Sequence, residues 1–525
     1  MRHARWLWAA TALGGVFLLT SLGVVFADGS TGARSTDAVV KEWVDEFEEI
    51  AKKKPTLAGK DRQLELIKGM EFGPCVTANR FLFGLMKSKK TPGDQRLYAL
   101  RCLLRMADKK TFGKLLGVLS KAKDPTLWNV FGRELLVRPS GAIREWAAGP
   151  AVKSRDPMML CAYLRARTRK PDAEQTKAIE KLFAKHAKEK GNADIAFHAL
   201  KALVRLAPKT YSEQLQQAAT HTDWRLRLAA ADILPVLQPF EGEVEAAVRA
   251  LVRDDSPVVQ RAAIDGVGRH RRTTLTKLLI ETLGSNVART RHVTVRALQA
   301  MTGQKFGHDP VAWARWHAEE DPGAPKTIES PRYHGIEIHS DDVVFLVDAS
   351  SSMTWPWEQD THRIDVALSE LRDTLDKLAP ETRFNVMVFA EDQVRWKKTS
   401  LPATPENTAA AGAWAATAMA KPAGDTFLYE AIQAALEDHP TCDTIFLLTD
   451  GNPTAGRYWT PDGIGASVRE WNRYRRTAIN TVGLSLRNLD LGRPNLSEKP
   501  AVMKRILSQI ATTTSGEYRE IEDAP

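Results

Sequence analysis

The sequence is poor in cysteine, with four cysteines among 525 residues and no C-x-x-C pair. Thiols that are so few and so widely separated exclude a disulfide-rich scaffold. Export would permit a disulfide between any two of Cys75, Cys102 and Cys161, but we expect these thiols and Cys442 to be free and buried. None of them has histidines at the spacing of a zinc site.

The motifs of familiar catalytic sites are also absent. Twelve histidines are scattered along the chain, and none forms an H-E-x-x-H pair. There is no Walker loop, no G-x-S-x-G elbow and no dinucleotide fingerprint. We therefore expect that the protein is not an enzyme of any of these classes.

Long apolar runs are absent except for one at the N-terminus. After Met1-Arg2-His3-Ala4-Arg5, residues 6–27 carry only three polar side chains and end in Val25-Phe26-Ala27. This pattern is typical of a secretory signal peptide, although 22 residues could just span a bilayer as an uncleaved anchor. Either interpretation predicts an exported protein that is periplasmic, at the cell surface or secreted, with membrane contact only through residues 6–27.

Charge is divided unevenly along the chain. From Asp341 onward there are 19 Lys and Arg against 27 Asp and Glu, a net charge of −8, whereas the preceding residues carry +18. A basic region suggests nucleic acid in an intracellular protein. For an exported protein we expect no nucleic acid, and an anionic surface polymer, lipid head groups or the acidic region of the same chain are better candidates. A solvated helical surface is the simplest explanation of the charge.

Apolar residues recur at helical spacing from Val39 onward for about 290 residues, and strand-like alternation is scarce. A repeat is visible late in this region. Residues 223–233 resemble residues 255–264, and residues 293–298 form a weaker third copy. An Asp, an Arg and an alanine-rich helix at this spacing resemble HEAT-type repeats, whose helix pairs stack into a solenoid. An irregular helical bundle is the alternative.

A different pattern begins at Val343, where five apolar residues are followed by Asp348-Ala349-Ser350-Ser351-Ser352. Such a run is typical of a strand buried on both faces of a parallel sheet. A D-x-S-x-S loop at its carboxyl end offers only oxygen ligands, which suit Mg²⁺ or Ca²⁺. A simple turn or helix cap would have the same composition.

Two later segments favour the metal site. Residues 444–451 repeat the pattern of a buried strand followed by Asp450 and a glycine, and Gly424-Asp425-Thr426 adds a third hydroxyl before a helical segment. These segments resemble the von Willebrand factor A domain with its metal-ion-dependent adhesion site, from Asp341 to about Ile521. The matching positions are Asp348, Ser350, Ser352, Thr426 and Asp450. Ser351 and Asp425 stand where many members have a glycine or another small residue.

The resemblance implies a multidomain chain: an N-terminal all-α, HEAT-like solenoid followed by a C-terminal α/β doubly wound (Rossmann-like) domain. The expected parts are a signal peptide or anchor (1–27), a linker (28–35), the helical repeats (36–320), a second linker (321–340) and the von Willebrand factor A domain (341–525). The resemblance also implies a divalent cation, Mg²⁺ first and Mn²⁺ or Ca²⁺ as alternatives. That cation would grip an Asp or Glu of a protein partner.

Two other functions are compatible with the sequence. The basic solenoid could dock on the acidic domain, so that the metal only stabilises the fold. A metal-assisted enzyme would need a base near Asp348, and Glu358, Asp360 and His362 are the nearby candidates, at spacings that match no known pattern. Trp355 and Trp357 could anchor a partner or pack over the edge of the domain.

Overall fold

The computed structural model describes residues 35–137, 141–166, 173–188, 190–207, 210–237, 243–269, 273–324, 330–358, 360–484 and 499–522. The apolar segment 6–27 lies outside these residues. No helix within the described ranges has both the length and the apolar character needed to cross a membrane. The chain divides into two compact units, Met1–Ala122 with Arg138–Ile143, and Lys123–Val137 with Arg144–Pro525.

The first unit is helical. Its helices are α2 (Thr36–Ala51), α3 (Leu57–Gly69), α4 (Val76–Lys87), α5 (Gly93–Met106) and α6 (Lys109–Ala122). Ser35 and Thr56 cap α2 and α3, because each side chain accepts a hydrogen bond from a free backbone N–H of the first turn. Helix α5 is buried along most of its length, since it packs against both α3 and α4.

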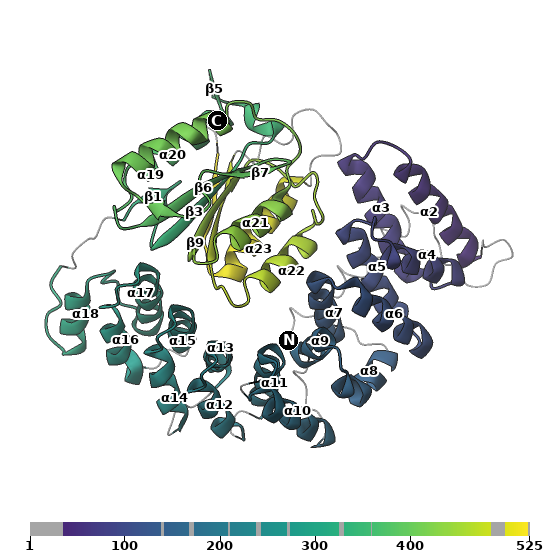
Figure 1. Ribbon diagram of the computed structural model, residues 1–525, viewed down its shortest axis with the longest axis horizontal. Helices are drawn as coiled ribbons and strands as arrows, with labels where there is room; N and C mark the ends of the chain where they lie inside the picture. Colours follow the sequence, from purple (N-terminus) through teal and green to yellow (C-terminus); the bar gives the residue numbers. More distant parts are fainter. Residues whose placement is uncertain are drawn as a thin grey trace, which may run out of the picture. The chain divides into compact units, whose positions relative to one another are not determined.

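The second unit begins with further helices. They are α7 (Pro125–Val137), α8 (Gly141–Ala148, which starts in the first unit), α9 (Pro157–Ala166), α10 (Ala173–His186), α11 (Ala193–Leu206), α12 (Ser212–Ala219), α13 (Trp224–Ile233), α14 (Glu243–Val252), α15 (Pro257–Arg269), α16 (Thr276–Thr282), α17 (Ala288–Thr302) and α18 (Pro310–His317). Odd-numbered helices from α7 to α17 pack side by side in one row, and α10, α12, α14 and α16 pair with them in a second row (Figure 1).

The repeat read from the sequence corresponds to consecutive helices of the first row, because its three copies fall on α13, α15 and α17. Asp223 caps α13, and Arg227 of that helix bridges to Asp254 at 2.7 Å, just before α15. A Cβ on Gly268 would lie 2.8 Å from the Cα of Ala297, so α15 and α17 approach too closely for any larger residue. The prediction of a helical repeat region is confirmed.

The C-terminal part is an α/β domain. Its strands are β1 (Arg332–Tyr333), β2 (Ile336–Glu337), β3 (Asp342–Asp348), β4 (Pro356–Glu358), β5 (Thr361–His362), β6 (Arg383–Phe389), β7 (Gln393–Arg395), β8 (Leu401–Pro402), β9 (Thr444–Thr449), β10 (Ala478–Leu484) and β11 (Tyr518–Ile521). The main sheet has the order β11-β10-β9-β3-β6-β7, and β8 also pairs with β6. Strands β11, β10, β9, β3 and β6 are parallel, whereas β7 and β8 run antiparallel.

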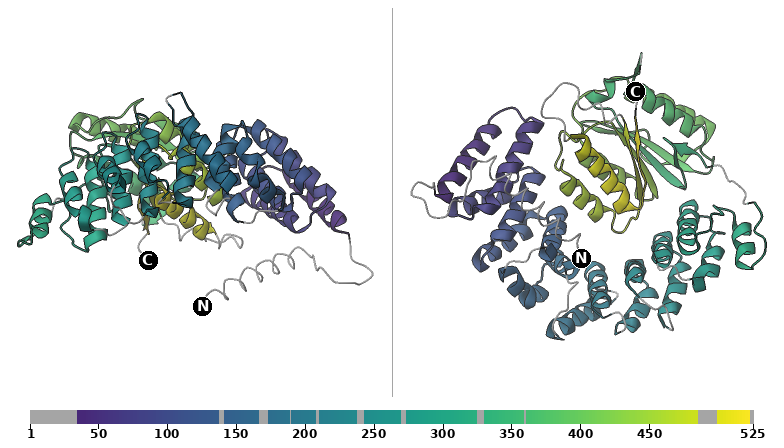
Figure 2. Two further views of the ribbon diagram at one scale, coloured as in Figure 1. Left: turned by 90° about the horizontal axis from the view of Figure 1, so that it is seen from below. Right: turned by 180° about the vertical axis from the view of Figure 1, so that it is seen from behind.

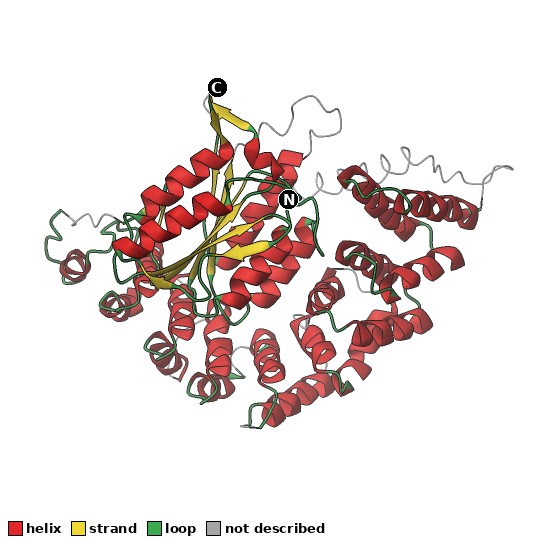
Figure 3. Cartoon of the chain, turned by 45° about the horizontal axis from the view of Figure 1, so that its top comes forward, coloured by secondary structure: helices red, strands yellow, loops and turns green. Residues whose placement is uncertain are grey.

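Helices cover both faces of this sheet, as Figure 3 shows. They are α19 (Arg363–Leu375), α20 (Pro405–Ala418), α21 (Leu428–Asp438), α22 (Pro461–Trp471) and α23 (Lys499–Thr514). Helices α19 and α20 lie on one face, and α21, α22 and α23 on the other (Figure 2). Strands β3 and β9 are buried at every residue because both faces are covered. The predicted fold class is confirmed.

Candidate metal site at the carboxyl ends of two strands

Asp348 is the last residue of β3, the strand in the middle of the parallel sheet. Its side chain is fully buried, so its two oxygens need partners inside the protein. One oxygen accepts a hydrogen bond from the backbone N–H of Ser350 at 2.7 Å, and the other accepts one from the Thr449 hydroxyl at 2.6 Å. The backbone therefore turns back over the carboxylate directly after the strand.

Asp450 directly follows β9, which pairs in parallel with β3. The pairing of Val347 with Leu448 brings the carboxyl ends of the two strands together, so the two aspartates are neighbours. The Ser352 hydroxyl donates to one oxygen of Asp450 at 2.7 Å, and Arg363 donates to the other at 2.8 Å. Arg363 begins α19 and is almost completely buried.

Thr426 reaches the site from the loop before α21. That loop is held to the D-x-S-x-S loop by the N–H of Ser351, which donates to the carbonyl of Gly424 at 3.2 Å. Gly424 has a φ of +82°, and a Cβ there would lie 2.8 Å from the side chain of Glu391. Glycine is therefore required at this turn. Ser350, Ser352 and Thr426 all line one surface cavity of about 420 Å³.

The site concentrates negative charge away from water. Burial and, to a smaller extent, the neighbouring carboxylate of Asp450 raise the pKa of Asp348 to about 7, and hydrogen bonds from Thr449 and Ser350 oppose this shift. Burial also raises the pKa of Asp450, although Arg363 and Ser352 oppose the shift. Arg363 forms an ion pair with Asp450, whereas Asp348 accepts hydrogen bonds from the neutral groups of Ser350 and Thr449. The two carboxylates together therefore favour an additional positive charge.

The donor set suits a hard divalent cation. The predicted ligands Ser350, Ser352 and Thr426 contribute neutral hydroxyls to the open cavity, and the two carboxylates lie buried beneath it. All five side chains offer oxygen, the ligand atom that Mg²⁺ and Ca²⁺ prefer. The structure brings all five predicted residues to the same end of the sheet, and their role as ligands remains a prediction.

Several residues around the site were not identified from the sequence. Arg363 and Thr449 bond directly to the two aspartates, and Glu391 and Thr454 line the cavity beside Thr426. Thr449 directly precedes Asp450, so its position at the strand end could have suggested it. The pairing of Arg363 with Asp450 joins residues 87 positions apart and carries no local sequence signal.

The side chains next to the first loop have distinct environments. Trp355 is 40% exposed, and its ring centroid lies 5.1 Å from the Cζ atom of the Arg363 guanidinium. Trp357 instead packs against the hydrophobic core of the domain. Asp425 is exposed and accepts a hydrogen bond from Thr454 at 2.8 Å. Asp360 and His362 are exposed, and His362 caps α19 together with Asp365. Glu358 is the last residue of β4.

Within the second unit, the helical rows contact the α/β domain through α22 and the residues around it. Asp124 accepts hydrogen bonds from Arg457 at 2.7 Å and from Tyr458 at 3.1 Å. Arg476 pairs with Asp232 at 2.5 Å, and Arg165 pairs with Glu470 at 3.2 Å. Each part thus contributes both acidic and basic side chains to these ion pairs. The contact is therefore more than a basic solenoid packed on an acidic domain.

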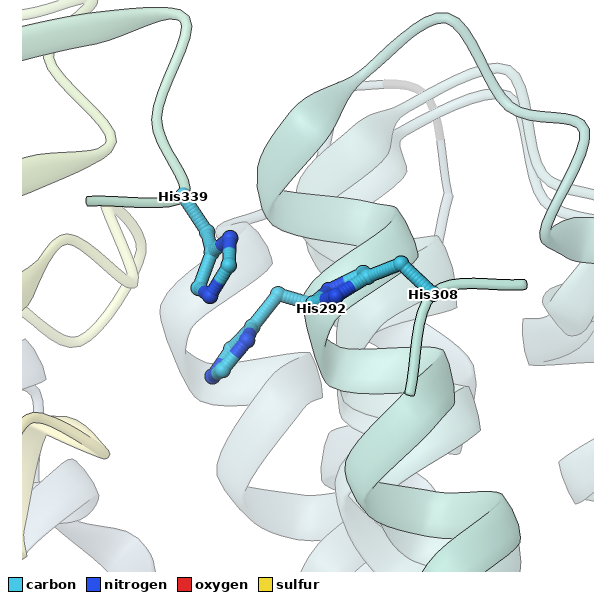
Figure 4. A group of neighbouring side chains, drawn as sticks. All are labelled: His292, His308 and His339. Carbon is cyan, nitrogen blue, oxygen red and sulfur yellow. The ribbon is translucent and has the colours of Figure 1, made fainter. Parts of the chain in front are cut away.

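A second group of metal-ligating side chains lies in the same unit. The group consists of His292 in α17, His308 before α18 and His339 before β3 (Figure 4). One ring nitrogen of each histidine lies within 4.8 Å of a ring nitrogen of the other two. Burial lowers the pKa of His292 to about 2 and that of His339 to about 4. No local sequence pattern indicates this group, because the three residues come from separate segments.

The four cysteines are free in the structure, and Cys102, Cys161 and Cys442 are buried. Burial raises the pKa of Cys102 and of Cys161 to about 12, so these thiols are protonated and unreactive at neutral pH. The expectation of free, buried thiols is confirmed for these three residues, while Cys75 is partly exposed.

Comparison with known proteins identifies the family of the α/β domain. Residues 343–452 match the family model of the von Willebrand factor type A domain. The chain is 31% identical over 147 residues to human inter-alpha-trypsin inhibitor heavy chain H4, and 32% identical over 142 residues to the mouse inter alpha-trypsin inhibitor, heavy chain 4. These matches cover 26% and 25% of this chain but only 15% and 14% of the relatives.

Two solved structures show weaker likeness. The PilB minor pilin from Streptococcus sanguinis aligns with 38% of this chain and 59% of its own, at 13% identity and a TM-score of 0.27. The RO (RSR) protein of Deinococcus radiodurans aligns with 93% of this chain and 96% of its own, at 14% identity and a TM-score of 0.21. Both TM-scores are too low to support a conclusion about architecture or function.

Proposed function

Because the chain contains a von Willebrand factor type A domain after a helical-repeat region, we propose that it binds a protein ligand through a divalent cation. The cation would be held by Asp348, Ser350, Ser352, Thr426 and Asp450. Mg²⁺ is the first candidate, and Mn²⁺ and Ca²⁺ are the alternatives. When bound, the ion supplies positive charge at the surface and a coordination position for an incoming carboxylate.

One observation carries this proposal: two buried carboxylates, of which Asp450 forms an ion pair with Arg363, lie beneath a cavity lined by serine and threonine hydroxyls. Buried charge without a partner costs several kcal/mol, so the arrangement favours an additional cation. Neutral hydroxyl ligands leave much of the charge of that cation uncompensated. The carboxylate of a Glu or Asp from a partner protein would then neutralise the remaining positive charge of the cation.

The surroundings of the cavity fit a protein partner. Trp355 is half exposed beside the site, and aromatic side chains are frequent anchors of protein interfaces. Glu391 and Asp425 stand at the rim, where they would repel an acidic partner until a cation is bound. Binding would therefore depend strongly on the metal. The helical repeats would provide a second contact surface or a spacer, and the partner would be met outside the cytoplasm.

The proposal is tested on the full chain by titrating Mg²⁺ and Mn²⁺ into wild type and into the isosteric variant Asp348→Asn. Calorimetry should show one bound ion in wild type, with a higher melting temperature, and at least a tenfold loss of affinity in the variant. Asp373→Asn, on the exposed face of α19, is the matched control and should bind like wild type. Equal metal binding by wild type and Asp348→Asn would contradict the proposal.

Partner binding separates this function from a scaffold in which the metal only stabilises the fold. Wild-type protein immobilised in Mg²⁺ should retain a partner from envelope or secreted fractions and release it in EDTA, and Asp348→Asn should not retain it. If the ion raises the melting temperature but the same partner is retained in EDTA, the scaffold function is favoured instead.

A further inference from the structure

A large basic cavity lies within the second unit, away from the candidate metal site. Its volume is about 820 Å³, and it is lined by helices α9, α11, α13, α15 and α17 together with α22 and the end of α23. Ten arginine and lysine side chains line it against two aspartates. Five of the ten basic side chains are paired with Glu470, Asp232 or Asp265.

Two of the other arginines, Arg261 and Arg289, are buried, and Arg469 is half-buried. All three have few hydrogen-bond partners among the described residues. Arg261 of α15 is 9% exposed and forms no hydrogen bond or ion pair with any described residue, although the charges of Asp443 and Asp341 attract it from farther away. Arg289 of α17 is 8% exposed, and its one hydrogen bond among the described residues goes to the carbonyl of Ser515 at 2.9 Å. On Arg469 of α22, Nε and Nη2 are both buried without a partner in the described part of the chain.

Burial of three guanidiniums around one cavity is unfavourable in the free protein. Burial lowers the pKa of Arg289 and of Arg469 to about 10, and it also lowers the pKa of Arg261. Such a shift shows that the surroundings disfavour the charged form. Charges that are retained at this cost are expected where a ligand of opposite charge binds.

We propose that this cavity binds a small molecule that carries phosphate groups. A guanidinium presents a planar fork of N–H donors that matches two oxygens of a phosphate. Arg261, Arg289 and Arg469 come from three different helices, so they can surround a compact anion with several oxygens. The volume lies within the range of small-molecule sites and is too small for a folded partner.

Pyrophosphate is a suitable probe, used in EDTA so that it cannot act through a bound metal. Calorimetry on the full chain should detect binding to wild type, and Arg261→Gln and Arg469→Gln should each weaken it by about tenfold, because each removes a charge-assisted hydrogen-bonding group. Arg315→Gln, an exposed arginine of α18 outside the cavity, is the control. Citrate tests whether carboxylates serve instead of phosphates.

The variants also distinguish a ligand site from structural arginines. Without ligand, Arg261→Gln should melt at a higher temperature than wild type, because a buried unpaired charge has been removed. A lower melting temperature would assign Arg261 a structural role and overturn the proposal. It would also be overturned if pyrophosphate did not bind, if citrate bound more tightly, or if both cavity variants bound pyrophosphate like wild type. Asp348→Asn should bind it normally, which separates this result from the proposed metal-dependent function.

The three-histidine cluster carries a second, independent inference. The rings of His292 and His339 are stacked, with their centroids 4.2 Å apart (Figure 4). The ring centroids of His308 and His339 are 4.5 Å apart. Nδ1 of His292 and Nε2 of His308 are buried and have no hydrogen-bond partner among the described residues. Nε2 of His339 lies 2.9 Å from a carboxylate oxygen of Glu337.

We infer that His292, His308 and His339 form a site for a zinc-like divalent ion. Imidazole is a preferred ligand of zinc, and three protein ligands with one open position form a common zinc site. A histidine that binds metal usually donates its second N–H to a carboxylate, as the contact between His339 and Glu337 allows. Such an ion would join α17 and α18 to the segment that leads into β3.

Cobalt is a direct probe, because tetrahedral Co²⁺ absorbs visible light. In an Asp348→Asn background, which removes the oxygen site, the full chain should bind one Co²⁺ that Zn²⁺ displaces. His308→Gln and His339→Gln should each abolish the absorption band, whereas the exposed His317→Gln should retain it. The inference would be overturned if no stoichiometric ion bound or if the band persisted in both cluster variants.

Discussion

The second unit contains two charge clusters of opposite sign. At the ends of β3 and β9, two buried carboxylates lie together and Asp450 pairs with Arg363, whereas the cavity beside α22 is lined by ten basic side chains and two aspartates. The acidic cluster is compact, and its hydroxyls already form a network. The basic cluster surrounds a volume about twice as large. The difference indicates that the acidic site suits a single ion and the basic site suits a polyatomic anion.

The largest expected effect comes from removing the internal cation of the acidic cluster. Arg363→Met should destabilise the metal-free protein by about 3–5 kcal/mol, because it leaves Asp450 buried without its ionic partner. Urea unfolding in EDTA measures the loss. Mg²⁺ should restore part of it, since the ion would then neutralise both carboxylates.

Arg395→Met is the control for that change, because Arg395 pairs with Asp438 at a much more exposed position. Its cost should be below about 1 kcal/mol. If the two methionine variants lost similar stability, the acidic cluster would not hold the unbalanced charge described above.

Asp232→Asn tests the role of one of the two aspartates that line the basic cavity. The Asp232 carboxylate pairs with Lys201 at 2.7 Å and with Arg476 at 2.5 Å, so the variant should lose about 2–3 kcal/mol of stability. The same change makes the cavity more positive, so pyrophosphate should bind more tightly. Unfolding and calorimetry on the same protein measure these opposite effects, and weaker binding by the variant would contradict the assignment of the cavity.

The stability difference between wild type and Asp232→Asn should depend on pH in one direction. The positive charges of Arg476 and Lys201 outweigh the effect of burial and lower the pKa of Asp232 below its usual value. A lowered carboxyl pKa contributes stability above the unfolded pKa of about 4, and this contribution is lost as the pH falls through the folded pKa. The two proteins should therefore converge in stability below about pH 4 in urea titrations.

Glu391→Gln tests whether a charge at the rim of the acidic site affects metal binding without contacting the metal. Glu391 lines the cavity and contacts the Asp425 backbone N–H at 3.4 Å, but it is not among the five proposed ligands. Removing its charge should weaken Mg²⁺ binding only by about threefold, because exposed charges interact weakly through water. A loss comparable to that of Asp348→Asn in a metal titration would make Glu391 a ligand.

The smallest effect is expected for Arg296→Gln at the basic cavity. Arg296 lines the cavity but is exposed, so water screens its charge. Pyrophosphate binding should weaken by about twofold, and the difference from wild type should disappear at high salt. An effect as large as that of Arg261→Gln would show that burial does not distinguish these arginines.

The sequence was most informative where local pattern and position on the sheet coincide. The apolar runs before Asp348 and Asp450 predicted adjacent buried strands, and parallel pairing of β3 with β9 brings the two aspartates to one edge. Thr426 could be predicted only through the family resemblance, since a loop alone does not fix where its side chain points. The helical repeats were visible where Asp caps and alanines recur.

Other features depend on packing between distant segments. Arg363 meets Asp450 because α19 begins beside the end of β9, which no local pattern specifies. The basic cavity requires arginines from α15, α17 and α22 to face the same space. On the sequence, these residues were indistinguishable from an ordinary solvated surface, and their burial became apparent only in three dimensions.

Helices α6 and α7 are separated by only Lys123 and Asp124, yet they belong to different compact units. Asp124 and Thr126 both bond to the α/β domain, Thr126 through the Ser467 hydroxyl at 2.9 Å. A shortened protein that starts at residue 341 would therefore expose the buried surface of α22, whereas one that starts at residue 123 keeps it covered. The position suited to dividing this chain for recombination or crystallisation lies inside the row of helices, not at the linker that follows it.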